Sequence, residues 1–155
     1  MTALNREEQA FWEACLHSNR NVAQDVHVFA SMPGNEAIAD ELIALYLSGI
    51  KTAGSALVAD YEKAGEPLPR VGDYWIMLDA GKKPVCVARV TQVLIKRFCD
   101  VGEDIARAEG EGDLSLEFWR EGHRRFFEPL LKELEIGDLN QALLAIDFVE
   151  VVYRR

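Results

Sequence analysis

Hydrophobic residues recur every three or four positions in four segments of the chain, which is the spacing of one helix face. These segments are residues 6–18, 36–48, 53–64 and 115–135. Asn5 and Glu8 have the spacing of a capping box at the start of the first segment. Asn35 precedes the second segment, and Gly49 and Gly65 follow the second and third. The pattern therefore predicts four main helices.

A denser pattern of Val, Ile and aromatic residues predicts strands in the second half. Tyr74–Leu78 reads as a first strand, residues 79–83 as a hairpin loop, and Pro84–Phe98 as a longer strand. Branched residues fall on both faces of that longer strand, so we expect much of it to be buried on both sides. A short helix over residues 100–108 and a last strand over Ala142–Tyr153 complete the series. This order predicts an α+β fold with a small, mostly antiparallel sheet that curls into a barrel.

The composition is that of one globular domain. The chain has 155 residues, of which 49% are apolar and 28% charged. No apolar run approaches the roughly 20 residues of a membrane helix, and the polar N-terminus lacks a signal-peptide core. Cys15, Cys86 and Cys99 are odd in number and widely spaced. We therefore expect a cytoplasmic protein with buried thiols, no metal and no cofactor, and leave its oligomeric state open, a homodimer included.

Charge is distributed unevenly along the chain. The net charge of −9 argues against a protein that coats nucleic acid non-specifically. Residues 80–99 nevertheless carry five basic residues and no acid, and an acid-rich stretch follows them over residues 100–113. A basic strip beside an acidic loop suits a confined polyanion site. Arg89 interrupts an apolar face of the predicted strand, so it either forms an ion pair or lines a cavity.

The stretch Leu47–Ser55 combines a turn with polar side chains. Gly49 ends one predicted helix and Thr52 opens the next, with Lys51 between them. Backbone N–H groups at a helix start attract anions. Lys51 beside Thr52 and Ser55 therefore indicates an anion or carbonyl pocket with a hydroxyl nucleophile, and a solvated lysine in a loop is the alternative.

A second polar segment precedes the last predicted helix. The sequence Glu109-Gly110-Glu111-Gly112-Asp113 spaces acids between glycines, and Ser115 then caps the helix. His123 lies on the apolar stripe of this helix, one turn after Trp119. It is either a hydrogen-bonded histidine of the core or a catalytic base.

Three motifs resemble one known family. Gly49-Ile50-Lys51-Thr52, after an amphipathic helix, looks like the G-x-K-x signature of the ASCH domain superfamily. Two further groups resemble its longer branch, formerly of unknown function: Gly65–Pro69 with Gly72–Tyr74 and Pro84–Val87, and Glu109–Leu116 with Trp119, Arg120 and His123. The resemblance covers about residues 29–153. It implies a helix and irregular lead-in over residues 1–28, followed by an ASCH domain over residues 29–155.

The resemblance implies a PUA-like β-barrel with flanking helices and a cleft that holds RNA or a modified nucleoside. Two activities are associated with the superfamily, cleavage of single-stranded RNA and hydrolysis of the acetyl amide of N4-acetylcytidine. Lys51 matches the lysine of the amidohydrolase branch, and Glu111 matches its glutamate, with Glu109 as the neighbouring alternative. The branch has its threonine where this chain has Gly54, and Ser55 follows one residue later.

These matches define a set of candidate site residues. Lys51, Ser55 and Glu111 are the candidate catalytic residues. The candidate substrate-binding residues are Thr52, Arg89, Tyr74, Glu109, Arg120 and His123. In RNA cleavage the basic members stabilise charge on phosphorus, Glu111 or His123 acts as base, and Tyr74 offers a stacking surface. The functional hypotheses are a ribonuclease acting on single-stranded RNA, an N4-acetylcytidine-type amidohydrolase, and a non-catalytic RNA- or ligand-binding module.

Overall fold

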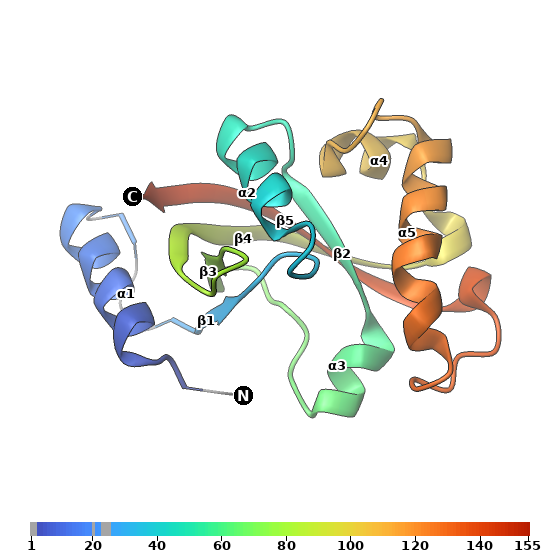
Figure 1. Ribbon diagram of the computed structural model, residues 1–155, viewed down its shortest axis with the longest axis horizontal. Coiled ribbons are helices and arrows are strands. Elements are labelled where there is room, and N and C mark those ends of the chain that lie inside the picture. The colour runs from blue at the N-terminus through green and yellow to red at the C-terminus, as the bar shows by residue number, and fades with distance from the viewer. Residues whose placement is uncertain (1–2, 20, 23–25) are drawn as a thin grey trace.

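The computed structural model describes residues 3–19, 21–22 and 26–155 (Figure 1). Its α-helices are α1 (Arg6–Ser18), α2 (Ala39–Ser48), α3 (Val58–Ala64), α4 (Glu103–Glu109) and α5 (Leu116–Leu131). Its strands are β1 (Val28–Ser31), β2 (Ala53–Leu57), β3 (Tyr74–Leu78), β4 (Pro84–Arg97) and β5 (Leu143–Arg154). Two short 3-10 helices, η1 (Phe98–Asp100) and η2 (Leu139–Gln141), lie next to β4 and β5. No helix in these ranges is long and apolar enough to cross a membrane.

The strands form one sheet in the order β1-β3-β4-β5-β2. β1 pairs in parallel with β3, and the other three pairings are antiparallel. The α+β class and the mostly antiparallel sheet are therefore confirmed. β1 and β2 form the two edges, so the sheet is open and the predicted barrel is not confirmed.

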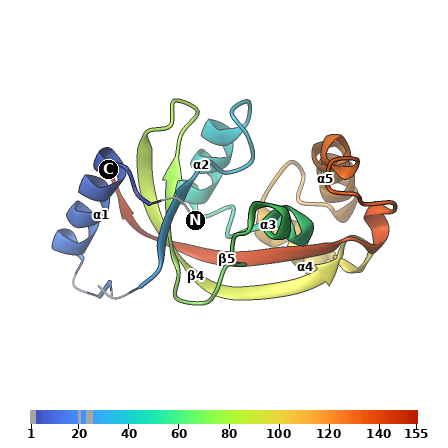
Figure 2. The same ribbon diagram turned by 90° about the horizontal axis from the view of Figure 1, so that it is seen from below.

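The two longest strands, β4 and β5, run the length of the molecule (Figure 2). Their register shifts at two bulges, between Val87 and Ala88 and between Val90 and Gln92. Residues 86–88 of β4 are fully buried, whereas Ile95 near its other end is 47% exposed. Burial on both sides thus holds only for the first half of the strand. The pairing of β4 with β3 ends at Arg89, so beyond it that edge of β4 has no partner strand in the described part of the chain.

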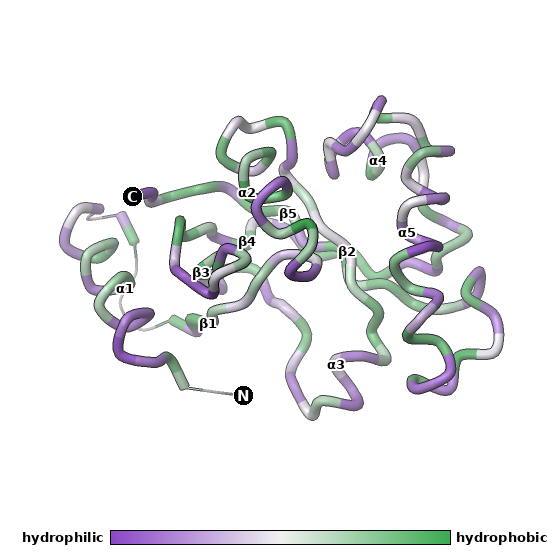
Figure 3. The backbone as a smooth tube through the Cα atoms, in the orientation of Figure 1, coloured by the Kyte–Doolittle hydropathy of each residue, from purple (hydrophilic) through white to green (hydrophobic). Residues whose placement is uncertain are grey.

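The first helix follows its sequence pattern closely. Asn5 accepts a hydrogen bond from the Glu8 backbone N–H, and the Glu8 side chain accepts one from the Asn5 backbone, which is the predicted capping box. Hydrophobic and hydrophilic positions alternate along both α1 and α5, so each helix has one apolar face (Figure 3). The apolar face of α1 carries Phe11 and Trp12 onto β3 and β4.

Tyr74 belongs to this apolar region under α1. Its ring lies 5.2 Å from that of Trp12, and the residue is 3% exposed. A stacking surface for nucleic-acid bases must be accessible. The assignment of Tyr74 to substrate binding is therefore wrong.

The predicted helix over residues 53–64 is also wrong in its first half. Ala53–Leu57 is strand β2, and the helix begins only at Val58. β2 pairs along its whole length with β5, and Ala53 and Leu57 are almost fully buried. Pairing with a neighbouring strand outweighs the weak helix preference of Gly54 and Ser55. Lys51 and Thr52 consequently precede a strand, and the helix start expected to attract anions there is absent.

Other boundaries shift by a few residues. α2 begins at Ala39, and the Asn35 side chain accepts a hydrogen bond from the Ala37 backbone N–H in the preceding turn. Gly49 ends that helix as predicted, in the left-handed conformation with φ +82°. Ser115 caps α5, which ends at Leu131 and not at residue 135. The irregular lead-in predicted before β1 includes residues 20 and 23–25, which lie outside the described residues.

Candidate functional site

Two segments that are far apart in sequence meet at Lys51. The Thr52 backbone N–H donates to the Ala108 carbonyl at 2.7 Å. Gly110 has φ +68°, and a Cβ there would lie 2.4 Å from the Ile50 carbonyl oxygen, so only glycine allows this approach. The turn after α2 and the loop after α4 are thus in direct contact. No cleft separates the two segments at this point, because their backbones pack together.

The Lys51 side chain extends into this contact and is 4% exposed. Its Nζ atom donates to the Glu109 carbonyl oxygen at 3.1 Å and to Glu111 Oε2 at 3.0 Å. Glu109 Oε1 lies 3.5 Å away, and the Tyr46 ring centroid lies 5.3 Å away. The ammonium is therefore held by hydrogen bonds to oxygen atoms of the acidic loop, and the solvated-lysine alternative is excluded.

Glu109 is the centre of the site and is 1% exposed. Its Oε2 accepts hydrogen bonds from Trp119 Nε1 at 2.7 Å and from Ser55 Oγ. Its Oε1 lies 3.0 Å from His123 Nε2. Burial alone would raise the pKa of this carboxyl group. The charge and hydrogen bond of His123, with Lys51 and Ser55, outweigh burial and lower the pKa to about 2.

His123 is held between two acceptors. Its Nδ1 lies 2.8 Å from the Trp119 carbonyl oxygen, and its Nε2 faces the Glu109 carboxylate. Neither partner can donate to nitrogen, so both ring nitrogens act as donors and the ring is an imidazolium. Burial lowers the pKa of His123, but the Glu109 charge outweighs it and the net shift is upward. The ring also stacks on Trp119 with centroids 4.1 Å apart.

The residues that form this cluster come from β2, α4 and α5 and from the segments next to β2 and α4. Lys51 precedes β2, and Ser55 lies on it; because side chains two apart in a strand share a face, both reach Glu109. Glu109 ends α4, Glu111 follows it, and His123 lies on α5. The structure thus brings together all three predicted catalytic residues, Lys51, Ser55 and Glu111, with two of the predicted binding residues. On the helix expected over residues 53–64, Ser55 would be turned by about 100° from position 54 and away from Lys51, but on strand β2 its hydroxyl reaches Glu109.

The other predicted binding residues are not part of this hydrogen-bonded cluster. Thr52 is exposed, and its hydroxyl donates to the Ala108 carbonyl at 3.2 Å. Arg89 is exposed and pairs with Glu150 at 3.2 Å, which is the ion-pair alternative. Arg120 lines a separate pocket on the other side of α5.

A cavity of about 320 Å³ lies beside Lys51. Its walls are residues 46–49 of α2 and the following turn, Lys51 and Thr52, and residues 149–151 of β5. Glu150, the partner of Arg89, is part of this wall. The cavity therefore adjoins both the Lys51 cluster and one ion pair of the basic strand β4.

Three residues at the site carried weaker sequence signals. Tyr46 is 4% exposed, and its hydroxyl lies 2.8 Å from the position that a Gly54 Cβ would take. Asp147 pairs with Gly54 across the β2–β5 ladder, and burial raises its pKa to about 6. An acid between Ile146 and Phe148 in an apolar strand was the available signal for it. Trp119 follows the helical stripe like any core residue, so its hydrogen bond to Glu109 left no trace in the sequence.

Glu109, Glu111 and His123 also have the donor set of a metal site. One ligand atom from each lies within 4.8 Å of the others. Lys51 Nζ, however, contacts both carboxylates. The ammonium already supplies the positive charge that a divalent cation would bring.

This combination of fold and site matches a known class of domain. The family model described as "ASCH domain" matches residues 29–153. The chain belongs to the ASCH domain family. A search of curated proteins gave no match at the level required.

Solved structures agree with this assignment. The crystal structure of an ASCH domain from Lactobacillus crispatus JV V101 is 33% identical, with 99% of each chain covered and a TM-score of 0.89. A protein from Enterococcus faecalis V583 is 31% identical over 94% of this chain and 88% of its own, with a TM-score of 0.80. A serine-to-alanine mutant of an ASCH protein from Zymomonas mobilis is 12% identical over 80% of this chain and 68% of its own, with a TM-score of 0.50; it is similar in fold alone.

Proposed function

We propose that this ASCH domain binds single-stranded RNA or a modified nucleoside in the cavity beside Lys51. The observation that carries the proposal is a lysine that is 4% exposed and still lines a cavity of about 320 Å³. That volume lies at the lower end of the range for small-molecule sites, about 300–1,000 Å³. A lysine among the lining residues of a cavity favours phosphate or carbonyl oxygen in the ligand.

RNA cleavage is the reaction that this arrangement supports best, because RNA carries its own nucleophile. The protein then needs a base for the 2′-hydroxyl and a cation for the charge that develops at phosphorus. Glu111 is not one of the residues that line the cavity, but it lies 3.0 Å from Lys51 Nζ and its side chain is 28% exposed, so we assign Glu111 as the base and Lys51 as the cation. The 2′-oxygen attacks phosphorus and loses its proton to Glu111. The bond to the 5′-oxygen breaks, leaving a 2′,3′-cyclic phosphate and a 5′-hydroxyl end that takes up a proton.

The test uses a short single-stranded RNA and the same sequence as DNA. We expect the RNA to be cut to products with a cyclic phosphate and the DNA to remain intact, as followed by mass spectrometry. Glu111→Gln removes the base and is expected to reduce the rate about 100-fold or more. Lys63→Met serves as control, because Lys63 pairs with Glu133 on the surface. RNA binding without cleavage would contradict the catalytic step and leave a binding module.

Amide hydrolysis is a second candidate because Ser55 and Lys51 share the Glu109 carboxylate. Its weakness is the base. Ser55 donates to a carboxylate whose pKa is about 2, and Lys51 is engaged as a donor to the acidic loop. Neither group is arranged to take the serine proton. We therefore expect no release of acetate from N4-acetylcytidine; efficient release that Ser55→Ala abolishes would make this the function.

A further inference from the structure

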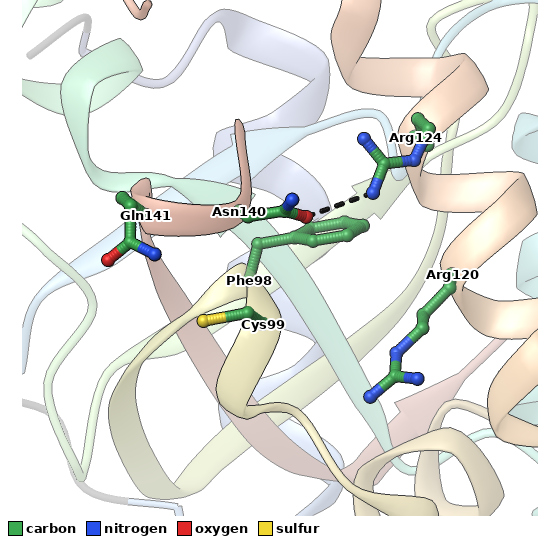
Figure 4. Close-up of a pocket in the computed structure, with 6 residues that line it drawn as sticks. All are labelled: Phe98, Cys99, Arg120, Arg124, Asn140 and Gln141. Carbon is green, nitrogen blue, oxygen red and sulfur yellow. Dashed lines mark hydrogen bonds between the residues drawn. The ribbon is translucent and has the colours of Figure 1, made fainter. Parts of the chain in front are cut away.

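A second cavity, with a volume of about 430 Å³, lies away from Lys51. Figure 4 shows the six residues that line it: Phe98, Cys99, Arg120, Arg124, Asn140 and Gln141. They come from α5 and from η1 and η2, which meet where the Phe98 backbone N–H donates to the Ala142 carbonyl at 2.9 Å. The wall of the pocket is thus formed by η1 and η2, which are joined by a backbone hydrogen bond, and by helix α5.

Helix α5 presents two adjacent rows of side chains to two different places. Trp119 and His123 both contact Glu109 in the Lys51 cluster. Arg120 and Arg124, each one residue further on, line the pocket. One residue turns a helix by about 100°, so the two rows lie on different faces of the same helix. The pocket therefore shares α5 with the Lys51 site and none of its polar groups.

The polar groups of the pocket are predominantly donors. Arg124 Nη2 donates to Asn140 Oδ1 at 3.0 Å, and its guanidinium lies over the Phe98 ring at 5.2 Å. The Gln141 side-chain oxygen accepts from Arg97 Nη1 at 2.9 Å. Both amide oxygens are thereby occupied, which leaves the two side-chain NH₂ groups as donors.

Arg120 completes the set of donors. Figure 4 shows its side chain extending from α5, and no ion pair or hydrogen bond to it occurs within the described residues. No carboxylate lines the pocket either. Asp100 is close in sequence, but it pairs with Arg97 at 2.9 Å. In a chain of net charge −9, this is a local concentration of positive charge without acidic neighbours in its wall.

We propose that this pocket is a second anion site, which binds the phosphate group of a nucleotide. Two arginines one helical turn apart line the same pocket, and Arg donors bind phosphate in bidentate geometry. The amide NH₂ groups supply further donors. The volume exceeds that of a phosphate alone, so the attached sugar has space. The proposal goes beyond the function proposed above, because it requires neither Lys51 nor cleavage.

The test measures binding of adenosine 5′-monophosphate, adenosine and inorganic phosphate by isothermal titration calorimetry. We expect the nucleotide and phosphate to bind and adenosine to bind at least about tenfold more weakly than the nucleotide. The double variant Arg120→Gln, Arg124→Gln should weaken nucleotide binding at least about tenfold. Arg125→Gln is the matched control, since Arg125 is an arginine of the same helix outside the pocket. Equal binding by wild type and double variant, or no binding by wild type, would overturn the proposal.

Two further arms distinguish the sources of the phosphate and the two sites. A short RNA with a 5′-phosphate is compared with the same RNA without it; preference for the former identifies a strand end, and equal affinity identifies an internal phosphate. Lys51→Met should leave binding of the mononucleotide at the arginine pocket unchanged. If Lys51→Met abolishes that binding while the arginine double variant retains it, the phosphate binds at the Lys51 cavity and the second site does not exist.

Discussion

The two ends of the sheet are filled in opposite ways. Under α1, the space is taken by rings: Phe11 lies 5.1 Å from Tyr153, and Trp12 lies 5.2 Å from Tyr74. Under α4 and α5, the buried groups include a carboxylate, Glu109, and an ammonium, Lys51, each less than 5% exposed. Apolar packing, which does not require a specific direction of contact, stabilises the end under α1. Directional hydrogen bonds are needed to stabilise the buried charged groups under α4 and α5.

This difference indicates where the chain is specialised. Apolar packing tolerates exchange of one hydrophobic residue for another of similar volume. A buried ionic network contributes little net stability compared with well-packed apolar side chains, and the loss of one member leaves the others unpaired. Retaining a buried lysine between two glutamates under α4 and α5 is therefore consistent with a functional role for that end.

Of the substitutions described below, Glu109→Gln should lower the free energy of unfolding most. The substitution keeps the shape of the side chain and removes the charge that faces Lys51 and His123. Removal of one partner from a buried ion pair costs about 3–5 kcal/mol in the free energy of unfolding. Urea denaturation of wild type and variant measures the difference. A change below about 1 kcal/mol would mean that the ionic network does not determine the stability of this end of the sheet.

Acidification should weaken the same end more than the other. The pKa of Glu109 is about 2 in the folded protein against 4.5 for an unperturbed glutamate. A lowered carboxyl pKa gives stability that is present above pH 4.5 and is lost as the pH falls toward 2. For this group the loss is about 3 kcal/mol. The raised pKa of His123 acts in the opposite direction, giving stability that is present below pH 6.5 and is lost as the pH rises through its folded value.

Denaturation at a series of pH values tests this expectation. Stability should pass through a maximum between about pH 4.5 and 6.5 and fall on both sides. In Glu109→Gln, stability should fall less steeply with decreasing pH, because the contribution of the Glu109 carboxyl group is missing. An acid limb of the same steepness in the variant would assign the loss to other carboxylates.

Gly54→Thr should have an intermediate effect. It places a hydroxyl three residues after Lys51, where the amidohydrolase branch has its threonine, but a Cβ there would lie 2.8 Å from the Tyr46 hydroxyl. Tyr46 is buried and must move. Overpacking of this kind costs about 1–3 kcal/mol. We expect a lower thermal midpoint and no release of acetate from N4-acetylcytidine; a variant as stable as wild type with new activity would show that Tyr46 yields.

Ile76→Val should have the smallest effect on stability, and it tests the apolar end of the sheet for comparison with Glu109→Gln. Ile76 is fully buried in the apolar core under α1. Loss of one methylene there costs about 0.5–1.5 kcal/mol. Since no titrating group is removed, denaturation should show the pH dependence of wild type displaced by a constant. A changed pH profile would mean that the two ends of the sheet are linked.

Local signals in the sequence predicted the fold where they agreed with the final contacts. The capping box of Asn5 and Glu8, the glycine after α2 and the serine cap of α5 are all confirmed, because each acts within one helical turn. β2 could not be predicted in this way. Ala53–Leu57 has no strong strand preference, and its pairing with β5 joins residues that are far apart in the sequence.

The candidate site was predictable in its residues more than in its arrangement. Lys51, Glu111 and His123 were found by motif, but the motif contains no information on burial or contact. The segments that carry Lys51 and Glu109 pack directly against each other, because Gly110 allows backbone contact with Ile50. Asp147 was missed because an isolated acid in a strand usually faces solvent.

The bond between Trp119 and Glu109 gives the site an optical reporter of its own. The chain has three tryptophans, and Trp12 and Trp75 lie in the other two apolar clusters. Only Trp119 donates its indole N–H to the central carboxylate, and its ring is stacked on the His123 imidazolium. Displacement of either partner by a ligand changes the surroundings of that one chromophore. In a Trp12→Phe, Trp75→Phe background, the emission of the natural side chain would follow occupancy of the Lys51 cluster without any attached dye.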